Sequence, residues 1–367
     1  MIRILADQNL YKLSEFLPPQ IDLVTYDPNI ELPDLDGYDA LLIRSVTKIN
    51  NGILDKIPSS LKFIGTGSSG IDHVEAEELQ NRGIHFVDAK GSNANVVAEY
   101  VITALIILSE KNERILSSKI GIIGVGAVGS RVHELLLKLG HETVLYDPPR
   151  EDREPGFTSS TIEDVLSCDV LTFHIPLEKN GELSTFHWLD ETKLANRNYL
   201  AIINAARGGV IDEQAVLAAK MDGRIDSLVI DVWENEPDLN PSFLRHCDFA
   251  TPHIAGSSIQ SKKNASRMLG KELSNYFHLE MPKEELSPKE EVLIQNELFT
   301  LPVLLSRIHP LLQYDAELRA TISNENKQIL FKQLRTDFPF RNEYSALRIP
   351  NLNLQKYPIL EKLGIEN

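Results

Sequence analysis

Short apolar runs alternate with polar, helix-like stretches through the first part of the chain. Such alternation is typical of buried strands that are connected by helices. The segment 74–82 has a helical pattern and is followed by Gly83, a common residue just after a helix. We therefore predict a parallel sheet covered by helices, with strands at Ile2–Leu5, Ile21–Thr25, Ala40–Ile43, Phe63–Gly65 and His85–Val87.

A second alternating unit follows the apolar segment 95–111, which we expect to be a helix that connects two lobes. Apolar residues at helical spacing predict further helices over 128–139 and 212–220. This order of elements is typical of a doubly wound nucleotide-binding lobe. Its predicted strands are Ile120–Ile123, Thr143–Tyr146, Val170–Phe173, Ala201–Ile203 and Leu228–Ile230.

The remainder of the chain predicts a returning helix, a linker and a small α+β module. The helix spans 257–277, and the charged stretch 281–289 with its two prolines reads as the linker. We expect module helices over 298–312, 324–334 and 360–363, and a strand over 345–349. The predicted fold class is α/β, with two doubly wound parallel-sheet (Rossmann-like) lobes and this C-terminal module.

Composition and charge narrow the class of protein. The 367 residues are 42% hydrophobic and 25% charged, as in ordinary globular proteins, and the net charge of −16 disfavours nucleic acid and anionic membranes. The longest apolar stretch, Val101–Leu108, is too short to span a membrane, and residues 1–7 do not resemble a signal peptide. Two cysteines are too few for a disulfide framework or a cysteine metal cluster. We expect a cytoplasmic protein without a bound metal.

Three glycines indicate a dinucleotide-binding site. Gly124, Gly126 and Gly129 follow a predicted strand and open a predicted helix, where phosphates meet unpaired N–H groups. Asp147 ends the next strand and would accept hydrogen bonds from the adenosine ribose, favouring NAD over NADP. The nearby Arg150 makes that preference less secure. The alternative is an ordinary glycine-containing turn, which the flanking strand, helix and aspartate make less favourable.

The type of reaction is indicated by three side chains, namely a cation, a carboxylate and an imidazole. Arg207 follows a predicted strand and could hold a carboxylate in a two-pronged grip. His253 is a natural acid–base group, and Glu236 could bond its second ring nitrogen, although the local sequence does not exclude Glu234. His174 ends another strand and could shape the cofactor pocket or be structural. Together these groups predict hydride transfer from a 2-hydroxy acid.

The segments around these residues resemble the D-2-hydroxyacid dehydrogenases. The similar motifs are the Gly-x-Gly-x-x-Gly loop, Asn-Ala-Ala-Arg-Gly-Gly, Asp-Val-Trp-x-x-Glu-Pro and Thr-Pro-His-Ile-Ala-Gly. The resemblance implies Arg207 as substrate anchor, Glu236 as histidine partner and His253 as proton donor and acceptor. It also implies a substrate lobe of residues 1–94 and 257–281, and an NAD lobe of residues 95–256. The implied NAD contacts are Gly124, Gly126, Ala127, Val128, Gly129, Asp147, His174, Ile175, Ala205, Ala206, Asp231 and Gly256.

Segments 42–48, 147–153, 314–319 and 342–347 resemble one branch of that family, which oxidises 4-phosphoerythronate in pyridoxal phosphate synthesis. This resemblance implies a homodimer, with 286–367 as the dimerisation domain. A phosphorylated acid needs a second anion site besides Arg207. The candidate substrate contacts are Arg44, Ser45, Thr66, Ser69, Gly70 and Ser257. Ser257 stands where this branch commonly has tyrosine, and Ile175 replaces a more usual threonine.

Two alternatives remain open. Another member of the family, such as one that oxidises 3-phosphoglycerate, would share the same three catalytic residues. A non-enzymatic, NAD-sensing binding protein could share the fold alone. The apolar residues of the C-terminal module could form a dimer contact or pack within one chain; they are Leu301, Leu304, Leu305, Ile308, Leu311 and Leu312.

Overall fold

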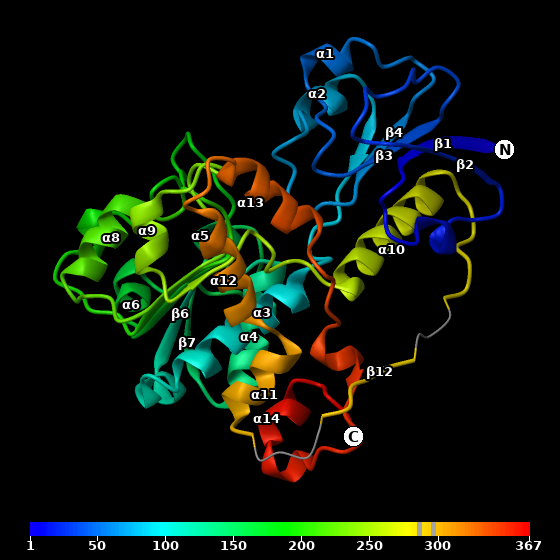
Figure 1. The fold of residues 1–367 in the computed structure, drawn as a ribbon. Helices are drawn as coiled ribbons and strands as arrows, with labels where there is room; N and C mark the ends of the chain where they lie inside the picture. Colours follow the sequence, from blue (N-terminus) through cyan, green and yellow to red (C-terminus); the bar gives the residue numbers. More distant parts are fainter. Residues whose placement is uncertain (285–287, 295–298) are drawn as a thin grey trace. The chain divides into compact units, whose positions relative to one another are not determined.

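The computed structural model describes residues 1–284, 288–294 and 299–367. The chain divides into two compact units. Unit 1 consists of Met1–Asn93 and Ser258–Pro288, and unit 2 consists of Ala94–Ser257 and Lys289–Asn367. Figure 1 traces the elements of both units. The structure therefore groups the C-terminal segment with the second lobe.

Unit 1 is built on a five-stranded parallel sheet in the order β2-β1-β3-β4-β5. All five strands were predicted, and their ends differ by at most two residues from the prediction. Two sets of apolar side chains are buried in this unit, in keeping with a parallel sheet that is covered on both faces. The strands are β1 (Ile2–Asp7), β2 (Ile21–Tyr26), β3 (Ala40–Ile43), β4 (Phe63–Thr66) and β5 (His85–Val87).

Among the described residues of unit 1, four helical elements accompany this sheet. The segments η1 (Leu13–Phe16) and α1 (Asn51–Leu54) were not predicted, since each is a single turn and too short to show a periodic pattern. The predicted helix over 74–82 is confirmed in a shorter form, α2 (Ala76–Asn81). The long helix α10 (Ile259–Tyr276) confirms the prediction for 257–277 and belongs to unit 1.

Helix α10 runs antiparallel to β4 (Figure 1). The ring of Tyr276, at the end of the helix, lies 5.5 Å from that of Phe63, at the start of the strand. The side chain of Leu269 fills the space beside Gly65 and Gly67, past the middle of the strand; a Cβ on Gly65 would lie 2.8 Å from it. The N-terminal part of α10 therefore lies toward the carboxyl ends of the strands.

Unit 2 contains a six-stranded parallel sheet in the order β11-β10-β9-β8-β6-β7. The five predicted strands are confirmed, and the two-residue strand β11 was missed because it is too short for a pattern. The chain visits β7 between β6 and β8, which are neighbours, so the strand order reverses there, as at a topological switch point. The strands are β6 (Lys119–Ile123), β7 (Glu142–Tyr146), β8 (Val170–Phe173), β9 (Ala201–Asn204), β10 (Leu228–Ile230) and β11 (Phe249–Ala250).

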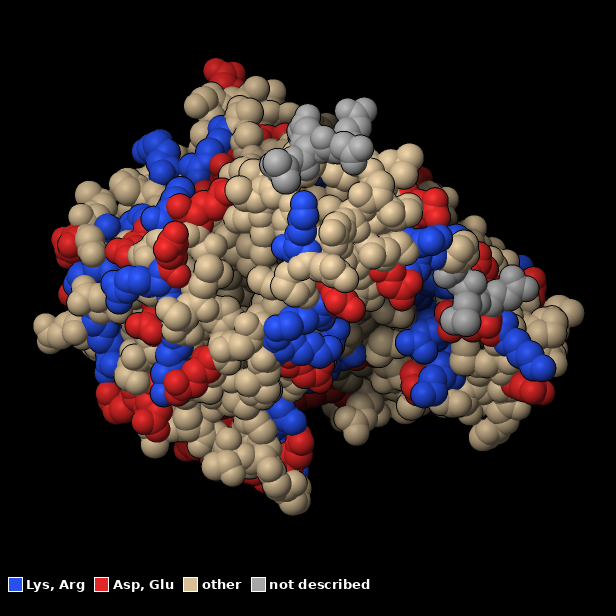
Figure 2. Space-filling model, turned by 90° about the horizontal axis from the view of Figure 1, so that it is seen from below, with Lys and Arg blue, Asp and Glu red and all other residues tan. Residues whose placement is uncertain are grey.

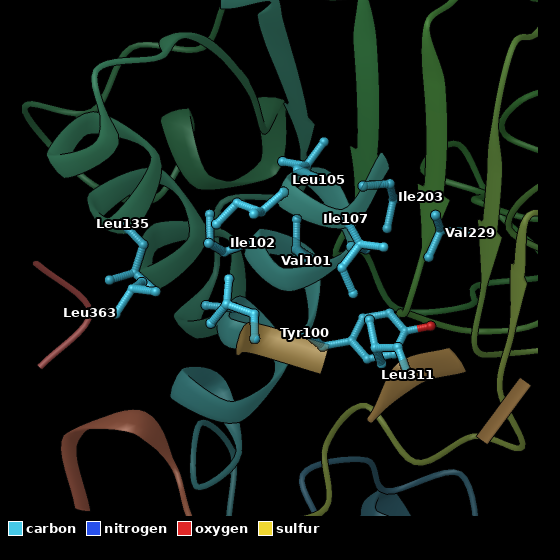
Figure 3. Close-up of a cluster of buried hydrophobic side chains, with 14 of the residues drawn as sticks. Tyr100, Val101, Ile102, Leu105, Ile107, Leu135, Ile203, Val229, Leu311 and Leu363 are labelled. Carbon is cyan, nitrogen blue, oxygen red and sulfur yellow. The ribbon is translucent and has the colours of Figure 1, made fainter. Parts of the chain in front are cut away.

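Helix α3 (Ala94–Leu108) is the centre of the unit 2 core. It is apolar on all sides and nearly every side chain is buried, as expected of a helix that has neighbours all round. Figure 3 shows Tyr100, Val101, Ile102, Leu105 and Ile107 of this helix beside residues of other elements, namely Leu135, Ile203, Val229, Leu311 and Leu363. The core of unit 2 thus joins the sheet to the C-terminal segment.

The other unit 2 helices before residue 257 flank the sheet. Helices α4 (Ala127–Leu139) and α8 (Glu213–Met221) confirm the predictions for 128–139 and 212–220. Five short elements were not predicted, again because they are about one turn long. These are η2 (Glu113–Ser117), α5 (Pro148–Glu151), α6 (Ile162–Leu166), α7 (Glu191–Leu194) and α9 (Pro241–His246).

The C-terminal segment differs from the prediction in two places. A single helix over 298–312 is wrong, although residue 298 lies outside the described residues. Two helices form, α11 (Leu301–Ile308) and α12 (Leu311–Thr321), because Pro310 lacks an N–H and disfavours helical backbone at the residue before it. The strand over 345–349 is reduced to β13 (Leu347–Arg348) after a 3-10 turn, η3 (Tyr344–Ala346).

The other C-terminal elements agree with the α+β pattern. Strand β12 (Glu290–Glu291) pairs with β13 in a parallel arrangement. Helices α13 (Lys327–Thr336) and α14 (Pro358–Lys362) confirm the predictions for 324–334 and 360–363, and η4 (Leu354–Lys356) precedes α14. The predicted linker over 281–289 includes residues 285–287, which lie outside the described residues.

Three of the apolar residues that were candidates for a dimer contact are buried within the chain. Leu304, Leu305 and Leu311 have no exposed surface and belong to the unit 2 core. Leu312 is 53% exposed. The helical apolar pattern of this segment therefore serves mainly to pack it onto its own chain.

A buried ion pair holds the C-terminal segment to α3. Arg341 Nη1 donates to Glu99 Oε2 at 2.7 Å, and the two side chains are 6% and 2% exposed. Glu99 Oε1 accepts hydrogen bonds from the Tyr344 N–H at 2.8 Å and from Asn95 Nδ2 at 2.9 Å. Asn95 Nδ2 also donates to Glu343 Oε2 at 2.7 Å. A carboxylate taken this far out of water is tolerable only with such partners.

The charged surface is mixed. On the face in Figure 2, Lys and Arg lie in small groups beside Asp and Glu. Within 1–284, 288–294 and 299–367, no helix is both long enough and apolar enough to cross a bilayer.

The variant Arg341→Ala tests whether the buried ion pair stabilises the packing of the C-terminal segment on α3. It leaves Glu99 buried without its cation, so we expect the free energy of unfolding to fall by about 3–5 kcal/mol. The control is Arg348→Ala, which breaks a half-exposed pair with Glu291 and should cost less than about 1 kcal/mol. Urea unfolding measures both, and equal losses would contradict the assigned role.

Candidate active site

The glycine loop lies at the switch point of the unit 2 sheet. Gly124 follows β6 with a φ of +87°, and a Cβ there would lie 2.6 Å from Ile175 Cγ2 and 2.7 Å from the carbonyl carbon of His174. A Cβ on Gly129 would lie 2.0 Å from the Gly124 oxygen. Both glycines are thus required by the close packing of β6, α4 and the loop after β8.

Gly126 is different, because nothing in the protein demands a glycine there. Its φ is −73°, and no heavy atom lies within 4 Å of the position that a Cβ would take. Gly126 is the N-cap of α4 and has no side chain to bond the first N–H groups of the helix, such as those of Ala127 and Val128. Open space at the N-terminus of a helix, where the first N–H groups have no partner within the helix, fits the pyrophosphate of a dinucleotide.

Asp147 and Arg150 both face this loop. Asp147 Oδ2 accepts the Val125 N–H at 2.7 Å, and Oδ1 accepts the Arg150 N–H at 3.0 Å. The Arg150 guanidinium binds Glu154 twice, at 2.7 and 2.8 Å, and donates to the Val125 oxygen at 2.6 Å. Because those bonds occupy its donors, Arg150 does not offer a 2′-phosphate an open fork. The geometry therefore favours NAD at this loop.

His174 lies just after β8, on the other side of the switch point. Its Nε2 lies 3.0 Å from Thr172 Oγ1. Its Nδ1 is buried, and no partner for it occurs among the described residues. Burial lowers the pKa of His174 to about 3, so the ring is neutral at physiological pH. A neutral imidazole with one unsatisfied nitrogen beside Gly124 is suited to a hydrogen bond with a bound ligand.

Arg207, Glu236 and His253 follow three adjacent strands. They come after the carboxyl ends of β9, β10 and β11 respectively, which is the edge where open parallel sheets bind ligands. The loops after β9 and β10 touch directly, because a Cβ on Gly208 would lie 1.8 Å from the Trp233 oxygen. Tertiary structure thus gathers residues that are far apart in the sequence.

Arg207 is held by its own loop. Its Nη1 donates to the Ala206 oxygen at 2.8 Å. Asn204, at the end of β9, donates from Nδ2 to the Arg207 oxygen at 3.1 Å and accepts the Ala206 N–H at 3.1 Å. These bonds fix the backbone from which the guanidinium extends, and Ala205 lies in the same turn.

His253 and Glu236 form a hydrogen-bonded dyad. His253 Nδ1 lies 2.8 Å from Glu236 Oε2, and Glu236 Oε1 accepts the Trp233 N–H at 2.9 Å. Burial acts to raise the pKa of Glu236, but His253, the Trp233 N–H and Arg335 outweigh it and hold the pKa below its usual value. An ionised Glu236 accepts the Nδ1 proton, which leaves Nε2 of His253 as the ring nitrogen that can take up a proton.

Asp231 shapes the loop that carries His253. The backbone oxygen of Asp231 accepts the His253 N–H at 2.8 Å. Its buried carboxylate accepts bonds from Thr251 Oγ1 at 2.6 Å and from the N–H groups of Ile254 and Ala255 at 2.8 and 3.0 Å. His253 is held at a φ of +57° within this loop. The sequence predicted Asp231 as a cofactor contact. In the structure its carboxylate binds the loop that carries His253.

The structure resolves the choice between the two neighbouring glutamates. Glu234 Oε1 lies 3.0 Å from His187 Nε2, and the Glu234 N–H donates to Glu213 Oε1 at 2.9 Å. Glu236 alone of the two bonds His253.

One contact near the dyad has no signal in the sequence. Arg335, on α13 of the C-terminal segment, has its Nη1 3.8 Å from Glu236 Oε2. Both groups keep some solvent contact, with 40% and 18% exposure, so the interaction is weak. Only the packing of α13 reveals this neighbour.

Five of the predicted substrate contacts lie in unit 1. Arg44 follows β3, and its Nε donates to Asp7 Oδ2 at 2.8 Å. Ser45 is exposed and Gly70 is half-buried. The other two, Thr66 and Ser69, use their hydroxyls within the unit.

Thr66 and Ser69 are engaged by protein groups. Thr66 is buried, and its Oγ1 lies 3.0 Å from His73 Nε2. Ser69 Oγ donates to Asn93 Oδ1 at 2.9 Å. These hydroxyls stabilise the loop after β4 in the present arrangement.

Gly256 and Ser257 are the last of the predicted site residues in unit 2. Ser257 is half-buried, and its N–H donates to the Ile254 oxygen at 2.8 Å. Within the ranges that the structure describes, no three His, Cys, Asp or Glu side chains are grouped to hold a metal ion.

The chain is similar to known proteins over nearly its whole length. Residues 108–255 match the family model described as D-isomer specific 2-hydroxyacid dehydrogenase, NAD binding domain. The erythronate-4-phosphate dehydrogenase of Yersinia enterocolitica is 37% identical over 375 residues, which cover 99% of this chain and 98% of that protein. The protein of the same name from Proteus mirabilis is 36% identical over 377 residues, with the same coverage of both chains.

Solved structures share the fold at lower identity. A D-lactate dehydrogenase from Treponema pallidum aligns with a TM-score of 0.61 at 21% identity, covering 77% of this chain and 100% of that one. A D-lactate dehydrogenase from Aquifex aeolicus, solved with NAD and lactic acid, aligns with a TM-score of 0.58 at 23% identity, covering 75% and 95%. These likenesses concern the two-lobed α/β fold.

The contrast between Gly126 and Gly129 gives a test of the nucleotide loop. We expect Gly126→Ala to leave the free energy of unfolding within about 1 kcal/mol, because its Cβ meets no protein atom. The methyl group should instead obstruct the dinucleotide and raise the Kd for NAD about tenfold or more. Gly129→Ala should destabilise the fold itself. Calorimetric titration and urea unfolding separate the two, and an unchanged Kd in Gly126→Ala would contradict the assignment.

Proposed function

The chain belongs to the erythronate-4-phosphate dehydrogenases, within the D-isomer specific 2-hydroxyacid dehydrogenase family, and on that premise we propose its reaction and the residues that carry it. The protein is an NAD-dependent oxidoreductase. Its substrate is 4-phospho-D-erythronate, which it oxidises at C2 to (R)-3-hydroxy-2-oxo-4-phosphooxybutanoate in pyridoxal 5′-phosphate synthesis. The observation that carries this proposal is the dyad of His253 and Glu236, beside Arg207 at one edge of the unit 2 sheet.

Arg207 and His253 divide the work of binding and proton transfer. Arg207 binds the C1 carboxylate, because a guanidinium matches two carboxylate oxygens. His253 accepts the C2 hydroxyl proton on Nε2, since Nδ1 is committed to Glu236 at 2.8 Å. Bound NAD supplies the hydride acceptor. The loop fits NAD because the space at Gly126 is open and no capping side chain covers the N-terminus of α4 at that residue.

Glu236 acts through the histidine. When His253 takes the proton, its ring becomes a cation, and the Glu236 carboxylate at 2.8 Å stabilises that charge. The Trp233 N–H keeps the carboxylate oriented, at 2.9 Å from Oε1. Asp231 holds the loop that carries His253 through hydrogen bonds from the N–H groups of His253 and Ile254.

The choice of acid is tested by direct assay. Purified protein with NAD is offered 4-phosphoerythronate and 3-phosphoglycerate, and NADH formation is followed at 340 nm. We expect clear turnover of the four-carbon acid. Turnover of 3-phosphoglycerate alone would favour the other branch of the family, and turnover of neither acid with normal NAD binding would favour a non-enzymatic NAD-sensing protein.

The two glutamates offer a matched pair for testing the dyad. We expect His253→Ala to lower kcat by about 100- to 10,000-fold, because proton transfer at C2 is lost while the NAD loop is untouched. Glu236→Gln should lower kcat by roughly 10- to 1,000-fold, since a neutral amide no longer stabilises the imidazolium. Glu234→Gln, whose side chain bonds His187, should stay within about twofold.

Steady-state kinetics and NAD titration of the same three variants decide the roles. Loss of NAD binding in His253→Ala, or equal effects of the two glutamate variants, would contradict the assignment of the dyad.

We also propose that the protein is a cytoplasmic homodimer, with the C-terminal segment as the main contact. Supporting this, the segment keeps large apolar side chains at its surface although most of its leucines are buried. Val303, Leu312 and Ile329, on α11, α12 and α13, are 41%, 53% and 57% exposed. Exposed apolar residues on three helices of one segment could be covered by a second copy of the chain.

A full-length double variant tests the dimer without removing the core residues of the segment. Leu312→Glu with Ile329→Glu should shift the sedimentation coefficient from that of a dimer to that of a monomer, because charge at an apolar contact is unfavourable. Met221→Glu, at a 67% exposed residue of α8, is the control and should remain dimeric. A double variant that stays fully dimeric would place the contact elsewhere.

A further inference from the structure

Helix α13 of the C-terminal segment packs on the loop that carries Glu236. Near the start of the helix, Lys327 Nζ lies 2.6 Å from Asp238 Oδ1. In the middle of the helix, Phe331 is 2% exposed and belongs to the same buried cluster as Trp233. The helix therefore contacts this loop through an ion pair and shares an apolar core with it.

Arg335 lies in the last turn of the same helix. It follows Lys327 by eight residues, which is about 12 Å along a helix axis. Its Nη1 lies 3.8 Å from Glu236 Oε2, and this is the oxygen that lies 2.8 Å from His253 Nδ1. The ion pair of Lys327 and the buried Phe331 hold α13 on the loop, so they also fix the position from which Arg335 reaches the dyad.

One carboxylate oxygen of Glu236 thus faces two groups that can carry positive charge. Burial acts to raise the pKa of Glu236, whereas His253, the Trp233 N–H and Arg335 act to lower it below its usual value. A fixed cation beside a carboxylate stabilises the ionised form of that carboxylate. The same cation disfavours a second positive charge nearby, so it opposes protonation of the His253 ring. Because the guanidinium is 40% exposed, water screens part of this effect.

Acidic side chains near the dyad act in the opposite direction. Burial raises the pKa of Glu213, on α8, to about 7, and the charges of Glu234 and Glu236 add to the rise. Glu234 is in turn bonded to His187. Negative charge around Glu236 favours protonation of the dyad, and Arg335 supplies a positive charge against it. These other groups are the same in wild type and in variants of Arg335, so a comparison of the two isolates the arginine.

We propose that Arg335 is a positioning residue of the dyad, which keeps Glu236 ionised toward His253 Nδ1 and keeps the His253 ring neutral to lower pH. The neutral ring is the form that accepts the C2 proton. This inference rests on the proposed function, because it assigns Arg335 a role in the same reaction. It adds to the three catalytic residues a charge from the C-terminal segment, which no sequence motif had indicated. The segment thereby acts on the chemistry of its own chain, besides any role in subunit contact.

The test compares the pH profiles of Arg335→Gln, Arg335→Lys and the control Lys332→Gln in the full-length protein. Lys332 is an exposed cation of the same helix. For each protein, kcat/KM for the NAD-dependent oxidation of 4-phosphoerythronate is measured from acid to alkaline pH.

We expect Arg335→Gln to move the acid limb of the profile to higher pH by about half a unit, because the guanidinium no longer opposes the imidazolium. On that limb kcat/KM falls about threefold. At alkaline pH the ring is neutral in both proteins, and kcat/KM stays within about twofold of wild type. Arg335→Lys keeps the positive charge and should lie close to wild type, and Lys332→Gln should match wild type at every pH.

An acid limb that does not move in Arg335→Gln would overturn the proposal. So would an equal fall of kcat/KM at every pH, which would mean that the arginine binds substrate or supports the fold and does not tune the dyad. A shift of the same size in Lys332→Gln would also overturn it, because any cation of the segment would then have the effect.

A direct titration separates this inference from the proposed function. The His253 ring is followed by NMR in protein with isotope-labelled histidine, and its signal is assigned by its loss in His253→Gln. The ring should become protonated at a pH about half a unit higher in Arg335→Gln than in wild type. If the wild type oxidises neither 4-phosphoerythronate nor 3-phosphoglycerate, the proposed function fails, and this titration still decides the role of Arg335. Equal midpoints in the two proteins would then overturn it.

Discussion

The buried carboxylate of Asp231 is the interaction on which the catalytic edge depends. Three donors of the loop 251–255 converge on its two oxygens, and its own backbone oxygen takes the His253 N–H. Such a charge is tolerable in the interior only when its hydrogen bonds are complete. The carboxylate needs the hydrogen bonds of the loop, and those same bonds hold the loop in one conformation. His253 is thereby held at a positive φ with its ring next to Glu236.

Close backbone packing completes the arrangement. Gly208 brings the loop of Arg207 against the Trp233 carbonyl, where no side chain could fit. Gly129 does the same for α4 against the turn at Gly124. In contrast, Gly126 faces open space. Glycine is thus needed in this short motif for two different physical reasons. Gly124 and Gly129 allow close packing within the protein, whereas Gly126 allows a ligand to approach.

The C-terminal segment is tied to the nucleotide-binding lobe by more than its sequence suggests. Its leucines join the core around α3, and the buried pair of Arg341 and Glu99 adds a requirement for correct docking. The same docking brings Arg335 near Glu236. A segment expected from resemblance to serve subunit contact therefore also contributes to the stability of unit 2 and to the surroundings of its dyad.

Local sequence was sufficient wherever a pattern extends over several residues. The ten predicted strands of the two sheets are confirmed, because each is a short run rich in apolar residues; the inner strands are largely buried, and the edge strands β2, β5 and β7 only partly. The glycine loop also lies where it was predicted, between strand β6 and helix α4, since both flanking elements show a clear pattern. The errors fall where a single residue outweighs the pattern, as Pro310 does in breaking an apolar repeat into α11 and α12.

The sequence by itself determined the chemical groups, their strand-end positions and the family resemblance, since these depend on residue identity and local periodicity. Only the tertiary structure decided which groups meet. It paired Glu236, and not Glu234, with His253, and it occupied the guanidinium of Arg150 with Glu154 and the Val125 oxygen. Contacts between distant segments depend on how helices and loops pack against the sheets, and no local pattern encodes that packing.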